Sequence, residues 1–311
     1  MRQATSTPAS ARRPAILAAM QDVMGPLPGE ERRVPLDLCI HAEERLEGTT
    51  RLRVSYAAEP GDRVPAHLFL PQRAQGPVPG VLCLHQTTTI GKDEPAGLGG
   101  LLNLHYALEL AQRGLVALAP DYPGFGDNHT DAYGLGYAST TMKAIWNHMR
   151  GLDLLQSLAE VQPDHLGCLG HSLGGHNTLF LAAFDERVRA AVTSCGFNSF
   201  RKYYGGDLTG WSHRGYMPRI ADVYGRDAER LPFDFPDVLV AIAPRALFVN
   251  APLRDSNFEV SGVHDCLTVA RPVYEALGAE ERLVAAFPDA EHDFPPAERE
   301  QAYRFLEEQL A

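Results

Sequence analysis

Paired cysteines, clustered basic residues and long apolar runs are all scarce in this sequence, and each shortage excludes a class of protein. The five cysteines are an odd number and form no C-x-x-C pair, which favours reduced thiols in a cytoplasmic enzyme over a secreted disulfide framework. The net charge of −11 argues against a nucleic-acid-binding protein, because phosphate neutralisation needs clustered Lys and Arg. No apolar run approaches the roughly 18 residues that indicate a membrane-spanning helix, so we expect no membrane partner.

Metal and cofactor motifs are also missing from the pattern. No group of His, Cys and carboxylate residues has metal-ligand spacing, and the glycine-containing segment 91–100 lacks the spacing of a phosphate-binding loop. We therefore expect neither a metal nor a cofactor.

The first thirty residues are interpreted as a helical arm. Two adjacent arginines precede an apolar segment, 15–20, that is shorter than a signal peptide usually needs. Ile16, Met20 and Met24 recur on one face, which predicts an amphipathic helix. That face is expected to dock on the body of the protein or on a second subunit, which would give a homodimer.

Two kinds of pattern follow, and together they predict one domain over residues 31–311. Residues 34–70 alternate like antiparallel strands, with a turn at 59–62. From residue 80, short apolar runs alternate with helical stretches, which is typical of a mostly parallel sheet with helices on both faces. The expected strands of this part are 80–85, 115–120, 165–170, 188–195, 245–251 and 282–288.

Residues 196–236 interrupt this alternation. The segment has no clean strand and is rich in Phe, Tyr and Trp. An insertion between two sheet strands lies over the carboxyl edge of the sheet, where open α/β sheets bind ligands. We interpret it as a lid or substrate wall, and we expect more than half of its aromatic side chains simply to pack it onto the body.

The sequence "GHSLG" at 170–174 has the form G-x-S-x-G, directly after an expected strand and before an expected helix. A sharp strand-to-helix turn strains the residue at its apex and exposes that residue's side chain. Glycines two positions before and two after remove side chains that would collide there. Ser172 is therefore the candidate nucleophile.

A serine nucleophile needs a base, and the base needs a third group that orients it. In this architecture the order along the chain is serine, acid, histidine. His292 follows an expected strand and precedes the last helix, whereas His264 has no strand directly ahead of it. Asp255 follows the strand that ends at 251 and is the preferred acid; Asp265 and Asp289 are the alternatives. The oxyanion would be held by the backbone N–H groups of Leu173 and Gln86.

Five motifs carry a resemblance to a known superfamily: "EPGDRVPAHLFLP", "LCLHQTTTIGKDEPAGLGG", "LAPDYPGFGD", "GHSLGG" and "EHDFP". Over residues 50–310 the chain resembles the α/β hydrolases, and most of all the dienelactone hydrolase and acetyl xylan esterase-like serine esterases. The resemblance implies an α/β-hydrolase fold and matches Ser172, Asp255 and His292 to the triad positions. Dienelactone hydrolases proper use cysteine as nucleophile, so the serine favours a general carboxylesterase. The oxyanion loop reads His85-Gln86 where the family usually has His-Gly, and His85 is expected to orient that loop.

These observations predict a serine carboxylesterase that acts on a small-molecule ester through an acyl-enzyme. A peptidase or amidase with the same triad is the runner-up, and a non-catalytic binding scaffold on the same fold is a third reading. Candidate substrate contacts come from the loop after the second parallel strand and from the insertion: Tyr122, Phe125, Tyr203, Tyr204 and Trp211.

Overall fold

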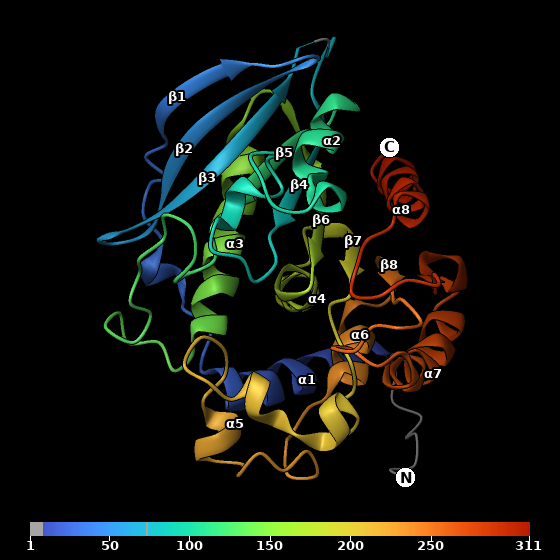
Figure 1. Ribbon diagram of the computed structural model, residues 1–311. Helices are drawn as coiled ribbons and strands as arrows, with labels where there is room; N and C mark the ends of the chain where they lie inside the picture. The colour runs from blue at the N-terminus through green and yellow to red at the C-terminus, as the bar shows by residue number, and fades with distance from the viewer. Residues whose placement is uncertain (1–8, 73) are drawn as a thin grey trace.

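The computed structural model describes residues 9–72 and 74–311, and its centre is one nine-stranded sheet (Figure 1). The strand order is β1-β2-β3-β5-β4-β6-β7-β8-β9. The pairs β1–β2, β2–β3 and β3–β5 are antiparallel, and the remaining pairs are parallel, which confirms the predicted α/β-hydrolase fold. The strands are β1 (Cys39–Arg45), β2 (Thr49–Glu59), β3 (Asp62–Pro71), β4 (Val78–Leu84), β5 (Val116–Pro120), β6 (Val161–His171), β7 (Val188–Ser194), β8 (Ala246–Asn250) and β9 (Leu283–Ala286).

Helices cover both faces of the sheet, as predicted (Figure 1). In β4, Leu82 and Leu84 belong to the core shared with α3 and α4, whereas Val81 and Cys83 belong to the core shared with α2 and α8. Because β4 is buried on both faces, both sets of its alternating side chains are apolar, which explains the continuous apolar run that predicted a strand there. The helices are α1 (Ala9–Met24), α2 (Tyr106–Gln112), α3 (Thr140–Ser157), α4 (Leu173–Phe184), α5 (Arg219–Asp222), α6 (Phe235–Ile242), α7 (Val260–Ala276) and α8 (Pro296–Gln309). Across the described residues, none of these helices has the length and apolarity needed to cross a membrane.

The predicted N-terminal helix is present as α1, which packs against α6 and α5. Ile16, Met20 and Met24 are buried in the same core as the body of the protein. This face is therefore occupied within the chain and is not free for a second subunit, so the homodimer predicted through it finds no support.

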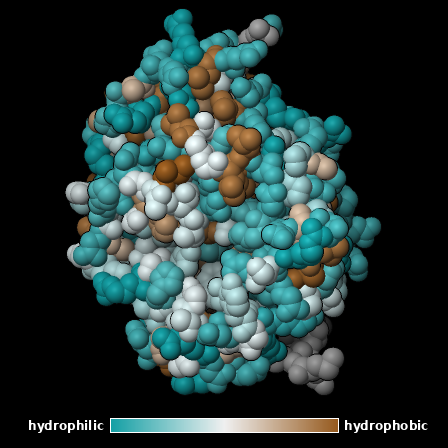
Figure 2. Space-filling model, in the orientation of Figure 1, coloured by the Kyte–Doolittle hydropathy of each residue, from teal (hydrophilic) through white to brown (hydrophobic). Residues whose placement is uncertain are grey.

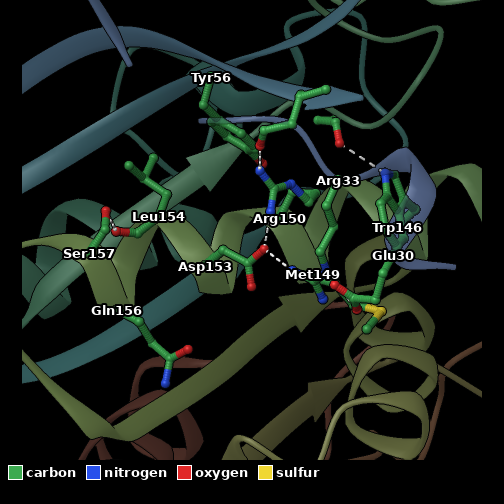
Figure 3. Close-up of polar contacts among 12 residues, drawn as sticks. Glu30, Arg33, Tyr56, Trp146, Met149, Arg150, Asp153, Leu154, Gln156 and Ser157 are labelled. Carbon is green, nitrogen blue, oxygen red and sulfur yellow. Dashed lines mark hydrogen bonds and ion pairs between the residues drawn. The ribbon is translucent and has the colours of Figure 1, made fainter. Parts of the chain in front are cut away.

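An ion cluster fastens the segment after α1 to α3. Asp153 accepts hydrogen bonds from the guanidinium groups of Arg33 and Arg150 (Figure 3), and Arg187 Nη1 donates to its other oxygen at 2.6 Å. The Arg33 guanidinium also lies 5.5 Å from the centroid of the Trp146 ring. The largely buried carboxylate of Asp153 thus joins α3 to the segment that contains Arg33 and to the one that contains Arg187.

A second cluster holds the β2–β3 hairpin against α3. Lys143 is fully buried, and its ammonium lies 2.5 Å from Glu59 Oε1 and 2.6 Å from Asp62 Oδ2. Burial alone would raise the pKa of Glu59, but the hydrogen bond and charge of Lys143 outweigh it and lower that pKa. The turn predicted at 59–62 is therefore anchored by a buried charge as well as by its sequence.

The insertion at 196–236 contains no strand and consists of short helical turns and α5 before α6 begins. Most of its aromatic side chains pack inward as expected, whereas Tyr204 is 59% exposed. Together with α1 it forms the lower part of the molecule in Figure 1. The buried aromatic residues of this segment are Phe197, Phe200, Tyr203, Trp211, Phe233 and Phe235.

Candidate active site

Ser172 stands between the end of β6 and the start of α4, with φ 53° and ψ −115°. Only strained turns hold a non-glycine residue there, at a cost of about 1–3 kcal/mol. A Cβ on Gly170 would come closer than 3.0 Å to the backbone of Gly174, and a Cβ on Gly174 would come equally close to the Leu84 carbonyl. The two glycines are therefore required by close backbone approach, which is the steric reason inferred from the motif.

His292 and Asp255 form a hydrogen-bonded pair: His292 Nδ1 lies 2.9 Å from Asp255 Oδ2. The other carboxylate oxygen accepts the backbone N–H groups of Asn257 at 2.8 Å and Phe258 at 3.0 Å. Burial alone would raise the pKa of Asp255, but His292 and these two N–H groups outweigh it and lower that pKa. Asp255 is therefore ionised at neutral pH and holds the Nδ1–H of the imidazole.

The pairing of β8 with β9 continues beyond both strands and brings these two loops together. The N–H of Ala251 donates to the carbonyl of Ala286, and the N–H of Leu253 donates to that of Pro288, each at 2.9 Å. The N–H of Arg254 then donates to the carbonyl of Ala290 at 3.0 Å. Two adjacent parallel strands thus deliver the acid and the histidine side by side.

The pair lies beside the serine turn. The rings of His171 and His292 make an edge-to-face contact with their centroids 4.9 Å apart, and His171 directly precedes Ser172. Between Ser172 Oγ and His292, both within the described part of the chain, no hydrogen bond is formed. Catalytic hydrogen bonds are often long or unformed before a substrate binds, so this gap does not argue against a serine–histidine contact.

Backbone donors for an oxyanion flank the serine. Leu173 is the first residue of α4, so its N–H is among those that have no partner inside the helix. In the facing loop, His85 Nδ1 lies 2.6 Å from the Gln86 carbonyl, and His85 Nε2 accepts the N–H of Tyr122 at 2.9 Å. His85 therefore uses both ring nitrogens to fix the loop, as expected. The Gln86 side chain donates to Glu94 at 3.0 Å and is held by that carboxylate.

Comparisons with known proteins agree with this fold. The model of the family described as "Glucuronyl esterase, fungi" matches residues 125–278. YtaP of Bacillus subtilis, which carries the name of a hydrolase, is 28% identical over 273 residues, covering 80% of this chain and 84% of its own. A glucuronoyl esterase from Solibacter usitatus has a TM-score of 0.76 at 20% identity, over 97% of this chain and 94% of that one. For acetyl xylan esterase 1 of Thermoanaerobacterium sp., the TM-score is 0.65 at 16% identity, with 99% and 96% covered.

The chain has the fold of the α/β hydrolases, and its sequence is similar to that of a hydrolase of Bacillus subtilis and, over residues 125–278, to the glucuronyl esterase family model. The predicted resemblance is thereby confirmed, and the family match adds the glucuronoyl esterases, which the motifs alone did not distinguish.

The alternative catalytic residues lie elsewhere in the fold. His264 is exposed on α7 and stacks on Phe287, with 4.4 Å between ring centroids. Asp265 pairs with Lys202 at 2.7 Å, and Asp289 pairs with Arg254 at the surface. None of the three contributes to the His292–Asp255 pair.

The five candidate substrate residues fall into two groups rather than one. Tyr122 and Phe125 pack beside His85 in the oxyanion loop, and the Tyr122 hydroxyl donates to the carbonyl of Gly215 at 2.9 Å. Tyr203 and Trp211 are buried behind Phe258.

Tyr204 belongs with the second group. It is largely exposed, and its hydroxyl lies 2.8 Å from Asn257 in the loop of Asp255. Of the five, the described structure therefore leaves Tyr204 as the one exposed side chain.

Two further rings near the candidate site were not singled out from the sequence. Tyr216 contacts the rings of Tyr122 and Trp211 and so connects the two groups, and its hydroxyl lies 3.2 Å from Thr87 Oγ1. Phe258 lies 5.9 Å from the ring of His292. Tyr216 was hidden among the many aromatic residues of the insertion, and Phe258 had no sequence signal beyond its closeness to Asp255.

Proposed function

We propose that the chain hydrolyses a carboxylic ester through an acyl-enzyme formed on Ser172, with His292 as the base and Asp255 as its orienting group. The hydrogen bond between His292 Nδ1 and Asp255 Oδ2 beside the strained serine turn is the observation that carries this proposal. It leaves His292 Nε2 with a lone pair directed away from the carboxylate. That nitrogen takes the Ser172 proton during attack and returns it to the departing alcohol.

The negative charge that develops on the ester oxygen is stabilised by the N–H groups of Leu173 and Gln86. Loss of one such donor costs about 2.7–4 kcal/mol of transition-state stabilisation in related chemistry. A water molecule, activated by the same imidazole, then releases the acid from Ser172. The first proton leaves with the alcohol, so the imidazole is neutral again when it takes a proton from water, and it returns this second proton to Ser172 Oγ as the acid departs.

For the substrate, we propose an ester of a sugar acid such as glucuronic acid. The family match and the glucuronoyl esterase fold support this choice. The insertion supports it as well, because Tyr216 contacts the loop after β4 and Tyr204 contacts the loop of Asp255. The insertion therefore contacts loops on both sides of the serine, and it offers the exposed Tyr204 and the half-buried Tyr216 as rings that could meet a sugar face.

The alcohol part of the ester is proposed to be apolar. The loop between β4 and α2 exposes Leu98, Leu101 and Leu102, and Asn103 ties this loop to Asp293, next to His292, at 2.7 Å. Apolar side chains also gather in the upper half of the face shown in Figure 2. A benzyl ester should consequently be a better substrate than a methyl ester of the same acid.

Two measurements test these proposals. A fluorophosphonate probe should label wild-type protein at Ser172 and leave Ser172→Ala unlabelled; equal labelling of both would refute the acyl-enzyme. The kcat/KM for benzyl glucuronate should exceed that for acetylated xylo-oligosaccharides and for p-nitrophenyl acetate. A preference for the acetyl esters would move the substrate to the acetyl xylan esterase type while leaving the mechanism in place.

A further inference from the structure

Three side chains that bind soft divalent cations converge beside the proposed base: His171, Cys195 and His292. One ligand atom of each lies within 4.8 Å of those of the other two. His171 ends β6, Cys195 follows β7 and His292 follows β9, so the carboxyl edge of the sheet brings them together. Ester hydrolysis assigns no task to His171 or Cys195.

The hydrogen bonds around His171 leave one of its ring nitrogens free to face this cluster. His171 Nδ1 lies 2.9 Å from Ser194 Oγ, which accepts a hydrogen bond from Asn250 Nδ2 at 2.8 Å. His171 Nε2 is buried and has no hydrogen-bond partner among the described residues.

His292 and Cys195 complete the donor set. Since Asp255 holds the Nδ1–H of His292, its Nε2 carries a lone pair. A carboxylate that accepts the second N–H of a histidine is the usual support for a metal-ligating imidazole. The Cys195 thiol donates to the carbonyl of Asp293 at 3.3 Å, and Asp293 directly follows His292 in the chain.

We propose that one zinc ion binds His171 Nε2, Cys195 Sγ and His292 Nε2, with water as fourth ligand, and that it switches off the esterase by occupying the base. Two imidazoles and a thiolate are a ligand set that suits zinc. On binding, the S–H bond of Cys195 breaks, its proton passes to solvent and the sulfur donates its electron pair to the metal. Zn–N and Zn–S bonds of about 2.0 and 2.3 Å require ligand atoms roughly 3.5 Å apart, so the three groups close in by about 1 Å.

The inhibition rests on the proposed function, because it follows only if His292 Nε2 is the catalytic base. Binding itself does not depend on that role and is measured separately. Metal-free full-length protein is titrated with Zn²⁺ by calorimetry and with Co²⁺ by absorption spectroscopy. We expect one ion per chain, a thiolate-to-cobalt charge-transfer band, and loss of ester hydrolysis with Zn²⁺ that EDTA reverses.

Two variants and a matched control make the test specific. Cys195→Ala removes the sulfur, and His171→Asn retains a polar partner for Ser194 while it removes Nε2. Each should raise the Zn²⁺ concentration for half-inhibition at least tenfold, and Cys195→Ala should abolish the thiolate band. Cys168→Ala removes another buried thiol, outside the cluster, and should change neither readout.

The outcomes separate the two proposals. Unchanged zinc inhibition in both variants, or a thiolate band that persists in Cys195→Ala, would overturn the site. Zinc that binds through Cys195 without slowing hydrolysis would overturn the switch. A chain that forms the band and hydrolyses no ester supports the metal site and overturns the proposed function instead.

Discussion

Replacement of Asp255 by Asn should disable the esterase by reversing the tautomer of His292. Asp255 Oδ1 accepts two backbone N–H groups, from Asn257 and Phe258. An asparagine must keep its carbonyl oxygen there, because the flipped amide would face two donors with a donor and lose both bonds. Each buried donor left without a partner costs about 1–3 kcal/mol. The amide NH₂ then faces His292 Nδ1, which must accept, so the ring proton moves to Nε2.

A proton on Nε2 removes the lone pair that would take the Ser172 proton. In a serine-protease triad the same exchange lowers kcat by about 10⁴-fold, equivalent to about 5.5 kcal/mol in the barrier. We expect a loss of this size in kcat for Asp255→Asn, with little change in KM. Steady-state hydrolysis of p-nitrophenyl acetate measures it, and a circular-dichroism melting curve shows whether the variant is folded.

The matched control is Asp289→Asn, since Asp289 lies in the loop of His292 but pairs with exposed Arg254. It should retain wild-type kcat. A folded Asp255→Asn protein with kcat within tenfold of wild type would refute the tautomer argument, and a large loss in Asp289→Asn would transfer the role to that residue.

Three further changes have defined outcomes. His292→Ala should lower ester turnover by several orders of magnitude while the exposed His264→Ala stays active; the reverse result in the same assay would reassign the base. Gly174→Ala places a methyl group against the carbonyl at the end of β4, so the soluble yield and Tm should fall sharply, whereas Gly76→Ala, with open space around it, should fold normally. Lys143→Met leaves the buried carboxylates of Glu59 and Asp62 without their cation and should lower the free energy of unfolding in urea by about 3–5 kcal/mol. Lys202→Met, at a partly exposed lysine whose partner Asp265 lies at the surface, should change it by less than about 1 kcal/mol. Because Lys143 lowers the pKa of Glu59, its stabilisation is present above the unfolded pKa near 4.5 and is lost as pH falls through the folded value; a variant with the same acid dependence as wild type would contradict this.

Much of the fold could be predicted because the residue pattern of most strands reflects whether one or both of their faces are buried. The doubly buried strands are uninterrupted apolar runs, and the hairpin turn at 59–62 carries Pro and Gly. The sequence pattern did not predict β1 as a separate strand. Six of its seven residues are exposed, and all of these except Ile40 are polar or small, so no alternation of apolar and polar residues marks it. Within the apolar stretch 101–114, helix α2 begins only at Tyr106, since the preceding leucines form a separate turn and two of them are exposed.

The candidate site divides in the same way. Ser172 was predictable because close backbone approach demands glycine at fixed positions, and Asp255 because a loop directly after a strand has little freedom. The network that joins His171, Ser194 and Cys195 was not, because it depends on which strands are neighbours in space. Sequence spacing carries no record of that order, so the same residues showed no metal-ligand pattern.

The shared ladder of β8 and β9 also has a consequence for biosynthesis. The segments that form the serine turn, β6 and α4, leave the ribosome first. His292 is encoded more than a hundred codons later, and its ring is aligned only when β9 pairs with β8. On the proposed mechanism, the growing chain therefore has no hydrolytic activity until β9 has paired with β8, late in translation.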